Sequence, residues 1–338
     1  MQIAPAHNKR TVWRALLLLC ATLPLLLAIV DKRATAHAPA PVNAVAPTAE
    51  LAVRADHPRI VTLYQGATDS AVALGITPVG VVDAWLEKPM YHYLRDDLNG
   101  VEHVGLETQP NLEKIAWLHP DLVVATEFRH QRIQPLLTAI APTITADNVF
   151  DFKSTLSLVA EATGREQEAD TLLRHWDSRV EDFQQQIALS QGDDWPQKVA
   201  VIRFKSDHMR LYSGGFAGHI LDELGFEQPD TLRTHGWGMK LSSTENIPIL
   251  DVDVLFVLLE PDPAIIENYQ RWSSHPLWQQ LEAVQQQRVF EVDAVNWMMG
   301  GGILAANAML DDLYRHYELQ PRSEAPSFAA DRRHLNAE

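Results

Sequence analysis

The 338-residue sequence predicts an α/β protein with two lobes, each built on a parallel sheet, joined by a single long helix. Two observations predict this class. Short, continuous apolar segments alternate with helical patterns, which is typical of parallel strands covered by helices on both faces. The same alternation starts again near residue 198, after one long amphipathic stretch.

The first half opens with a strand at 60–64, followed by a helix from Thr68 or Asp69 to Leu74. Further elements are expected as strands at 79–82, 122–125, 142–144, 198–204, 252–259 and 288–292, and as a helix at 216–224. Between the halves, one apolar face repeats at Leu172, Trp176, Val180, Phe183 and Ile187. Steps of three and four residues predict a long helix in which Trp176 packs. Three more tryptophans in helical patterns are expected to pack: Trp117, Trp272 and Trp278.

A weak internal repeat supports the two-lobe prediction. The pattern Glu113-x-Ile115-x-x-Leu118-x-x-Asp121 returns 132 residues later as Glu245-x-Ile247-x-x-Leu250-x-x-Asp253. An apolar strand is expected after each copy. The matching places in the two halves indicate equivalent helix–strand units.

The N-terminus has the pattern of a secretory signal peptide. A basic start precedes an apolar run at 15–30, and small residues suited to cleavage follow at 34–38. The run is shorter than the roughly 20 residues that span a bilayer, but the charged residues at 31–33 leave an uncleaved anchor open. The expected organisation is a signal peptide (1–38), a flexible lead-in (39–56), an N-terminal lobe (57–164), an interlobe helix (165–190), a C-terminal lobe (191–318) and a flexible tail (319–338).

Composition excludes several functional classes. The formal net charge is −16, and it becomes −20 without residues 1–38, which carry five basic residues and one acidic residue. Such an acidic chain lacks the basic face of a nucleic-acid binder, and any anionic ligand needs local cations. The only cysteine, Cys20, lies inside the apolar run, so the exported chain has no disulfide.

Several motifs resemble the periplasmic substrate-binding proteins for iron–siderophore complexes. The most specific is the stretch from Pro110 to Ile115 followed by Leu118-x-Pro120-Asp121-Leu122-Val123. The start at Arg59-Ile60-Val61, the segment 74–80, Trp278 and the segment 292–297 are similar to the same family. The resemblance runs from about Arg59 to Tyr317, and the ferric-citrate and related siderophore binders are its nearest part.

The resemblance implies two Rossmann-like lobes with limited hinge motion and a ligand between them. It also implies a monomer in the periplasm that hands a ferric siderophore of citrate, hydroxamate or catecholate type to an ABC permease of the inner membrane. The siderophore itself would hold the iron, so no cofactor and no direct metal ligand are expected. In this family one acidic residue on each lobe docks onto the permease, and the repeat offers Glu113 and Glu245 for that role. The open alternative is that both only favour a helix N-terminus.

Loops that follow the carboxyl ends of strands face the crevice of such sheets. Guanidinium groups there suit anionic oxygens, and aromatic walls suit an apolar ligand backbone. The expected ligand-binding residues are therefore Tyr64, Trp85, Arg129, Arg203, Arg210, Tyr212, Trp237 and Trp297. Arg129 could instead pair with Glu127 or Asp147, and Arg203, inside an apolar strand, could pair internally.

Two other functions remain open from the sequence. Cobalamin or haem could occupy the same scaffold, and a secreted α/β enzyme is the alternative from a different class. No G-x-S-x-G elbow, phosphate-binding P-loop or paired-histidine zinc motif supports catalysis. The runs Ser213-Gly214-Gly215 and Gly300-Gly301-Gly302 indicate close backbone approach or helix starts.

Overall fold

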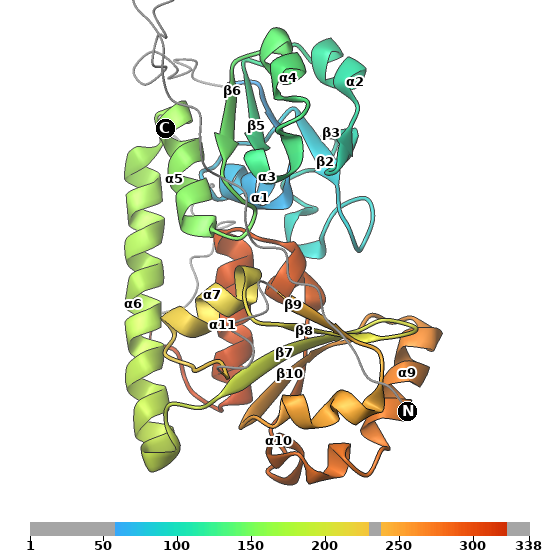
Figure 1. The fold of residues 1–338 in the computed structure, drawn as a ribbon. Helices are drawn as coiled ribbons and strands as arrows, with labels where there is room; N and C mark the ends of the chain where they lie inside the picture. The colour runs from blue at the N-terminus through green and yellow to red at the C-terminus, as the bar shows by residue number, and fades with distance from the viewer. Residues whose placement is uncertain (1–57, 230–237, 323–338) are drawn as a thin grey trace, which may run out of the picture. The chain divides into compact units, whose positions relative to one another are not determined.

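A computed structural model describes residues 58–229 and 238–322. The expected signal peptide, the lead-in at 39–56 and Trp237 lie outside these residues, as does the tail beyond 322. None of the helices in the described ranges is both long and apolar enough to span a membrane. The described chain contains two sheets and one long helix (Figure 1), which confirms the two-lobe α/β class. The exact division into segments stays a prediction.

The sheet of the N-terminal lobe has the order β4-β3-β2-β1-β5-β6. It is parallel except for β4, which pairs antiparallel with β3. Its strands are β1 (Ile60–Thr62), β2 (Gly80–Asp83), β3 (Glu102–Leu106), β4 (Gln109–Pro110), β5 (Leu122–Thr126) and β6 (Thr143–Ala146). Alternate residues of β5 point to opposite faces: Val124 joins the cluster with α1 and α5, and Val123 the cluster with α2 and α4. Both faces are therefore covered, as predicted.

The sheet of the C-terminal lobe has the order β11-β10-β7-β8-β9. Its strands are β7 (Val199–Phe204), β8 (Met209–Tyr212), β9 (Gly238–Leu241), β10 (Val254–Leu258) and β11 (Val289–Val292). Only β7, β10 and β11 are parallel, whereas β8 and β9 are antiparallel. The expectation of a fully parallel sheet was wrong here, because the chain turns back directly after β7 as a hairpin. Residues 209–212 are thus a strand rather than a loop.

Helices occupy much of the remaining described chain. They are α1 (Gln65–Ala73), α2 (Leu112–Trp117), α3 (Glu127–His130), α4 (Gln134–Ile140), α5 (Phe152–Thr163), α6 (Glu166–Gln191), α7 (Gly215–Glu223), α9 (Pro263–Ser273), α10 (Glu282–Gln285) and α11 (Ile303–His316). The first helix begins at Gln65, earlier than expected, because Tyr64 takes the extended cap position and neither Thr68 nor Asp69 caps it.

The long helix α6 runs alongside both sheets (Figure 1). Its stripe of Trp176, Val180, Phe183 and Ile187 is buried, which confirms the predicted apolar face. These side chains belong to one core cluster that also contains residues of β1, β5, β7 and β10. One continuous apolar core therefore connects the two lobes along this helix.

The internal repeat has a structural cause. In the first copy, Asp121 accepts a hydrogen bond from the backbone N–H of Arg59 (2.9 Å), just before β1. In the second, Asp253 accepts one from the N–H of Lys198 (2.6 Å), just before β7. Each Asp thus fixes the start of the strand that pairs in parallel with the strand after the repeat. The two copies are equivalent units of the two lobes.

The tryptophan predictions divide. Trp176, Trp272 and Trp278 are buried, as expected, but Trp117 is 72% exposed, so the prediction that it packs was wrong. Trp117 is the last residue of the short helix α2, and Ile115 alone is buried within that helix. A single turn and a half offers too little buried face to cover an indole ring.

Candidate functional site

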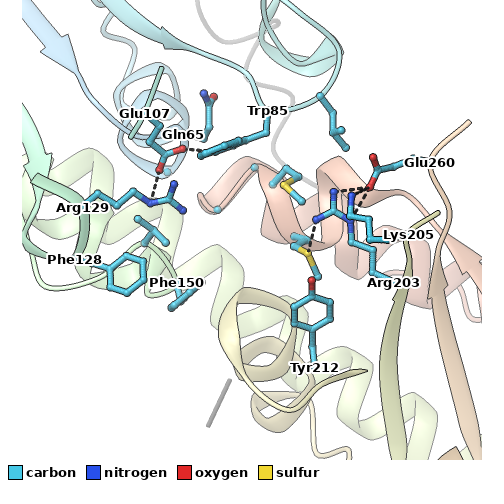
Figure 2. Close-up of a pocket in the computed structure, with 17 residues that line it drawn as sticks. Gln65, Trp85, Glu107, Phe128, Arg129, Phe150, Arg203, Lys205, Tyr212 and Glu260 are labelled. Carbon is cyan, nitrogen blue, oxygen red and sulfur yellow. Dashed lines mark hydrogen bonds and ion pairs between the residues drawn. The ribbon is translucent and has the colours of Figure 1, made fainter. Parts of the chain in front are cut away.

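A cavity of about 480 Å³ lies between the two lobes. Figure 2 shows side chains from both lobes pointing into it. The N-terminal lobe contributes Gln65, Gly66, Trp85, Leu86, Glu107, Phe128, Arg129, Val149 and Phe150, and the C-terminal lobe contributes Arg203, Lys205, Tyr212, Glu260, Met298, Met299, Gly300 and Gly301. We call Trp85, Glu107, Phe128, Arg129 and Phe150 the N-lobe wall, and Arg203, Lys205, Tyr212, Glu260 and Met298 the C-lobe wall.

A guanidinium stacked on an indole dominates the N-lobe wall. The Arg129 Cζ atom lies 5.2 Å from the centroid of the Trp85 ring, within the range of a cation–π contact. Glu107 contacts both residues: its carboxylate pairs with Arg129 Nε at 3.3 Å and accepts a 2.5 Å hydrogen bond from Trp85 Nε1. These contacts hold the two side chains as one unit at the cavity surface.

Glu107 is only 3% exposed, and burial raises its pKa despite the opposing effect of Arg129. Its backbone is fixed from behind by His130, whose Nε2 lies 2.8 Å from the Glu107 carbonyl oxygen. His130 Nδ1 accepts a hydrogen bond from the N–H of Thr126, so the ring donates through Nε2 as a neutral imidazole. Burial also lowers the pKa of His130, which keeps it neutral.

The C-lobe wall holds two cations on one acid. Glu260 contacts Arg203 Nη2 at 2.5 Å and Lys205 Nζ at 2.7 Å. Burial pushes the pKa of Glu260 up, but Lys205 and Arg203 outweigh it and hold the pKa below its ordinary value. A second edge of Arg203 points at the thioether of Met298, 3.7 Å away. Because one carboxylate faces two cations, this wall keeps a net positive charge.

The backbone explains these positions. Arg129 lies in the short helix α3 directly after β5, and Glu107 directly follows β3, so both stand at carboxyl ends of parallel strands. Glu260 likewise follows β10. Arg203 lies near the end of β7 and is directly opposite Arg210 of β8. Such opposed residues share a face of the sheet, but Arg210 does not line the cavity.

Four of the predicted ligand-binding residues line this cavity: Trp85, Arg129, Arg203 and Tyr212. For each arginine the alternatives were a place in the ligand cleft or an ion pair with an acid. Arg129 and Arg203 do both, because each lines the cavity and also pairs with a glutamate. Arg129 pairs with Glu107, not with Glu127 or Asp147.

Besides Arg210, two further predicted residues do not line the cavity. Trp297 is 0% exposed, its indole N–H donates to Asp312, and its ring packs on Phe256. Tyr64 is equally buried and donates to Thr155 Oγ1 at 3.2 Å. Both belong to the main core cluster, whereas Gly66, Gly300 and Gly301, which we call the cavity floor, line the cavity. We therefore leave Trp297 and Tyr64 out of the proposed site.

Sequence reasoning did not single out Glu107, Lys205 or Glu260. The available signal was their place: Glu107 and Glu260 each follow an apolar strand closely, where the crevice rule applies. Within the described ranges, no cluster of His, Cys, Asp and Glu side chains is arranged to hold a metal ion.

Comparisons with known proteins agree with this architecture. The model of the family described as periplasmic binding protein matches residues 60–295. An achromobactin-binding periplasmic protein of Dickeya dadantii is 49% identical over 76% of this chain and 85% of its own length. A probable siderophore-binding lipoprotein of Bacillus subtilis, YfiY, is 38% identical over 78% of this chain and 84% of its own.

Among solved structures, Staphylococcus aureus SirA complexed with staphyloferrin B is 38% identical, with a TM-score of 0.75. The match covers 79% of this chain and 95% of SirA. The fold of this chain thus has a counterpart in a solved relative. On the family match and these identities, the chain belongs to the periplasmic binding protein family.

Proposed function

We propose that this chain captures a ferric siderophore with anionic oxygen groups and delivers it to an ABC permease, acting as a binding protein and not as an enzyme. One observation carries the proposal. Three cationic side chains, Arg129, Arg203 and Lys205, face one interlobe cavity in a chain whose formal net charge is −16. Such local cations attract an anionic ligand against the field of the whole protein.

The difference between the walls supports an orientation for the ligand. Arg203 and Lys205 outnumber Glu260, so the ionised oxygens of the complex face the C-lobe wall. Arg129 is balanced by Glu107 and stacked on Trp85, so the less charged part of the ligand faces the N-lobe wall. The named ligands of the relatives, achromobactin and staphyloferrin B, support the siderophore class.

The test is a titration of the purified protein with a panel of ferric siderophores, followed by intrinsic tryptophan fluorescence. Ferric citrate, a ferric hydroxamate and a ferric catecholate cover the three chemical types. We expect saturable quenching, strongest for an anionic complex. Binding of haem or cobalamin alone, seen as intense visible absorption bands, would contradict the proposal.

We further propose that Glu113 and Glu245 contact the permease. Both are exposed and stand in the first turn of α2 and of the short 3-10 helix Thr244–Leu250. The equivalence of the two repeat copies supports a matched pair, one on each lobe, which suits a two-fold partner.

Charge reversal at both positions, E113K with E245K, is expected to abolish uptake in cells while ferric siderophore affinity stays unchanged. The matched control is Glu282→Lys, since Glu282 is also exposed in the first turn of a short helix, α10. Normal uptake by the double variant, or equal loss in the control, would remove the docking assignment. Lost folding would favour a purely capping role.

A further inference from the structure

A buried carboxylate joins the two lobes beneath the cavity. Asp69 lies in α1, the helix whose first residues Gln65 and Gly66 line the cavity, and it is fully buried. Its Oδ1 accepts a hydrogen bond from the backbone N–H of Leu304 (2.9 Å), and its Oδ2 accepts one from Ala305 (3.1 Å). Both N–H groups belong to the first turn of α11 in the C-terminal lobe.

The helix α11 receives no cap from its own flanking residues. It starts after Gly302, which has no side chain to accept from the first N–H groups, and these groups need acceptors. The helices α5 and α9 are capped from within their own lobe by Asp151 and Asp262. Asp69 accepts hydrogen bonds from the first turn of α11 across the two lobes, as Asp151 and Asp262 do for their own helices. The dipole of α11 favours a negative charge at this end.

Glycines bring the two backbones together at this contact. A Cβ atom on Gly66 would lie 2.6 Å from the carbonyl oxygen of Gly301, and one on Gly302 would collide with the Asp69 carboxylate. A Cβ atom on Gly300 would lie 2.7 Å from the hydroxyl of Tyr93. The expectation of close backbone approach at the 300–302 run is therefore confirmed, and its partner is the other lobe.

The contact also reaches the N-lobe wall. Tyr93 donates its hydroxyl to Asp69 Oδ2 at 2.9 Å. The Tyr93 ring stacks on Tyr91, with centroids 6.3 Å apart, and the Tyr91 hydroxyl accepts a 3.3 Å hydrogen bond from the N–H of Trp85. Asp69 is thus connected to the cavity through its floor and through one wall.

We propose that Asp69 is a positioning residue for ligand capture, which fixes the cavity floor by holding α1 of one lobe against α11 of the other. Separating the lobes at the floor would leave a carboxylate and two N–H groups without partners in a dry contact, which is strongly unfavourable. Any movement of the two lobes apart is therefore confined to the rim of the cavity. Burial raises the pKa of Asp69 to about 7, although the hydrogen bonds from Leu304, Ala305 and Tyr93 favour its ionised form.

The role of Asp69 in capture rests on the proposed function, but the interlobe contact can be tested without a ligand. The variants are Asp69→Asn, Asp69→Ala and Gly302→Ala, and the matched control is Asp262→Ala, which removes a helix cap within one lobe. In the full chain without ligand, hydrogen exchange is measured at residues 65–66 and 300–305. Affinity and dissociation rate are measured with ferric citrate, and the free energy of unfolding with urea.

We expect faster exchange at both sides of the floor in the three variants, and about tenfold weaker binding through faster dissociation, since preorganisation is lost. The Asp262→Ala control should lose stability without either change. Unchanged exchange at residues 65–66, or equal loss of affinity in the control, would overturn the proposal. If Asp69→Ala does not fold, the exchange rates and affinities of Asp69→Asn and Gly302→Ala test the proposal. Failure of the wild-type protein to bind any ferric complex would count against the proposed function. The hydrogen-exchange rates would still test the contact between Asp69 and α11, because they are measured without ligand.

Discussion

Both walls of the cavity pair a glutamate with cationic side chains, but the number of cations for each glutamate differs. On the N-lobe wall one buried acid, Glu107, faces one cation, and burial raises its pKa. On the C-lobe wall Glu260 faces two cations, and they lower its pKa. The first wall is therefore a nearly neutral, aromatic surface and the second is a cationic one. In the proposed function, the C-lobe wall therefore recognises the charge of the ligand and the N-lobe wall its shape.

The largest effect is expected for the cationic wall. Arg203→Ala removes a guanidinium from the wall with net positive charge, and a charge-assisted hydrogen bond contributes about 1.5–3 kcal/mol. We expect affinity for ferric citrate to fall by more than about tenfold. Arg288→Ala is the control, because Arg288 pairs with Asp194 and does not line the cavity. Equal titration curves for Arg203→Ala and wild type would contradict the comparison.

Arg129→Ala should weaken binding less, by about threefold to tenfold, because Glu107 already balances its charge. Its effect on stability should be greater than that of Arg203→Ala. Glu107 would be left buried without a cation, whereas Glu260 would keep Lys205. Urea unfolding of both variants checks this opposite order. If Arg129→Ala loses more affinity and less stability than Arg203→Ala, the roles of the walls are reversed.

The two acids should affect stability with opposite dependence on pH. The folded-state pKa of Glu107 is raised above 4.5, so its contribution to stability is lost as pH rises above that value. The pKa of Glu260 is lowered below 4.5, so its contribution is lost as pH falls below that value. Unfolding free energies of the wild type, Glu107→Gln and Glu260→Gln across the acidic range measure both trends. If the stability contributions of Glu107 and Glu260 changed in the same direction with pH, the contrast between the two walls would be wrong.

The smallest expected effect is spectroscopic. Trp85→Phe should reduce the fluorescence quench caused by a bound ferric complex, because Trp85 lines the N-lobe wall. Trp176→Phe should leave the quench nearly unchanged and lower stability, since Trp176 is in the core. Binding affinity should change little in the Trp176→Phe variant. A quench lost with Trp176→Phe and kept with Trp85→Phe would place the ligand away from the cavity.

The sequence by itself determined the class of fold and most strand positions, because strand and helix periodicity are local properties of the chain. It also located four cavity residues by their place near strand ends, including Arg129 after β5. The long helix could also be predicted from its apolar periodicity. The repeat could be predicted because Asp121 and Asp253 each stand directly before an apolar strand.

Only the tertiary structure decided which side chains reach the cavity and what they pair with. Trp297 and Tyr64 are adjacent to cavity residues in sequence, but both side chains are buried in the core. The pairing of Glu107 with Arg129, and of Asp69 with α11, joins residues 22 and 235 positions apart. No local pattern encodes such contacts, because they depend on how sheets and helices far apart in the chain pack together.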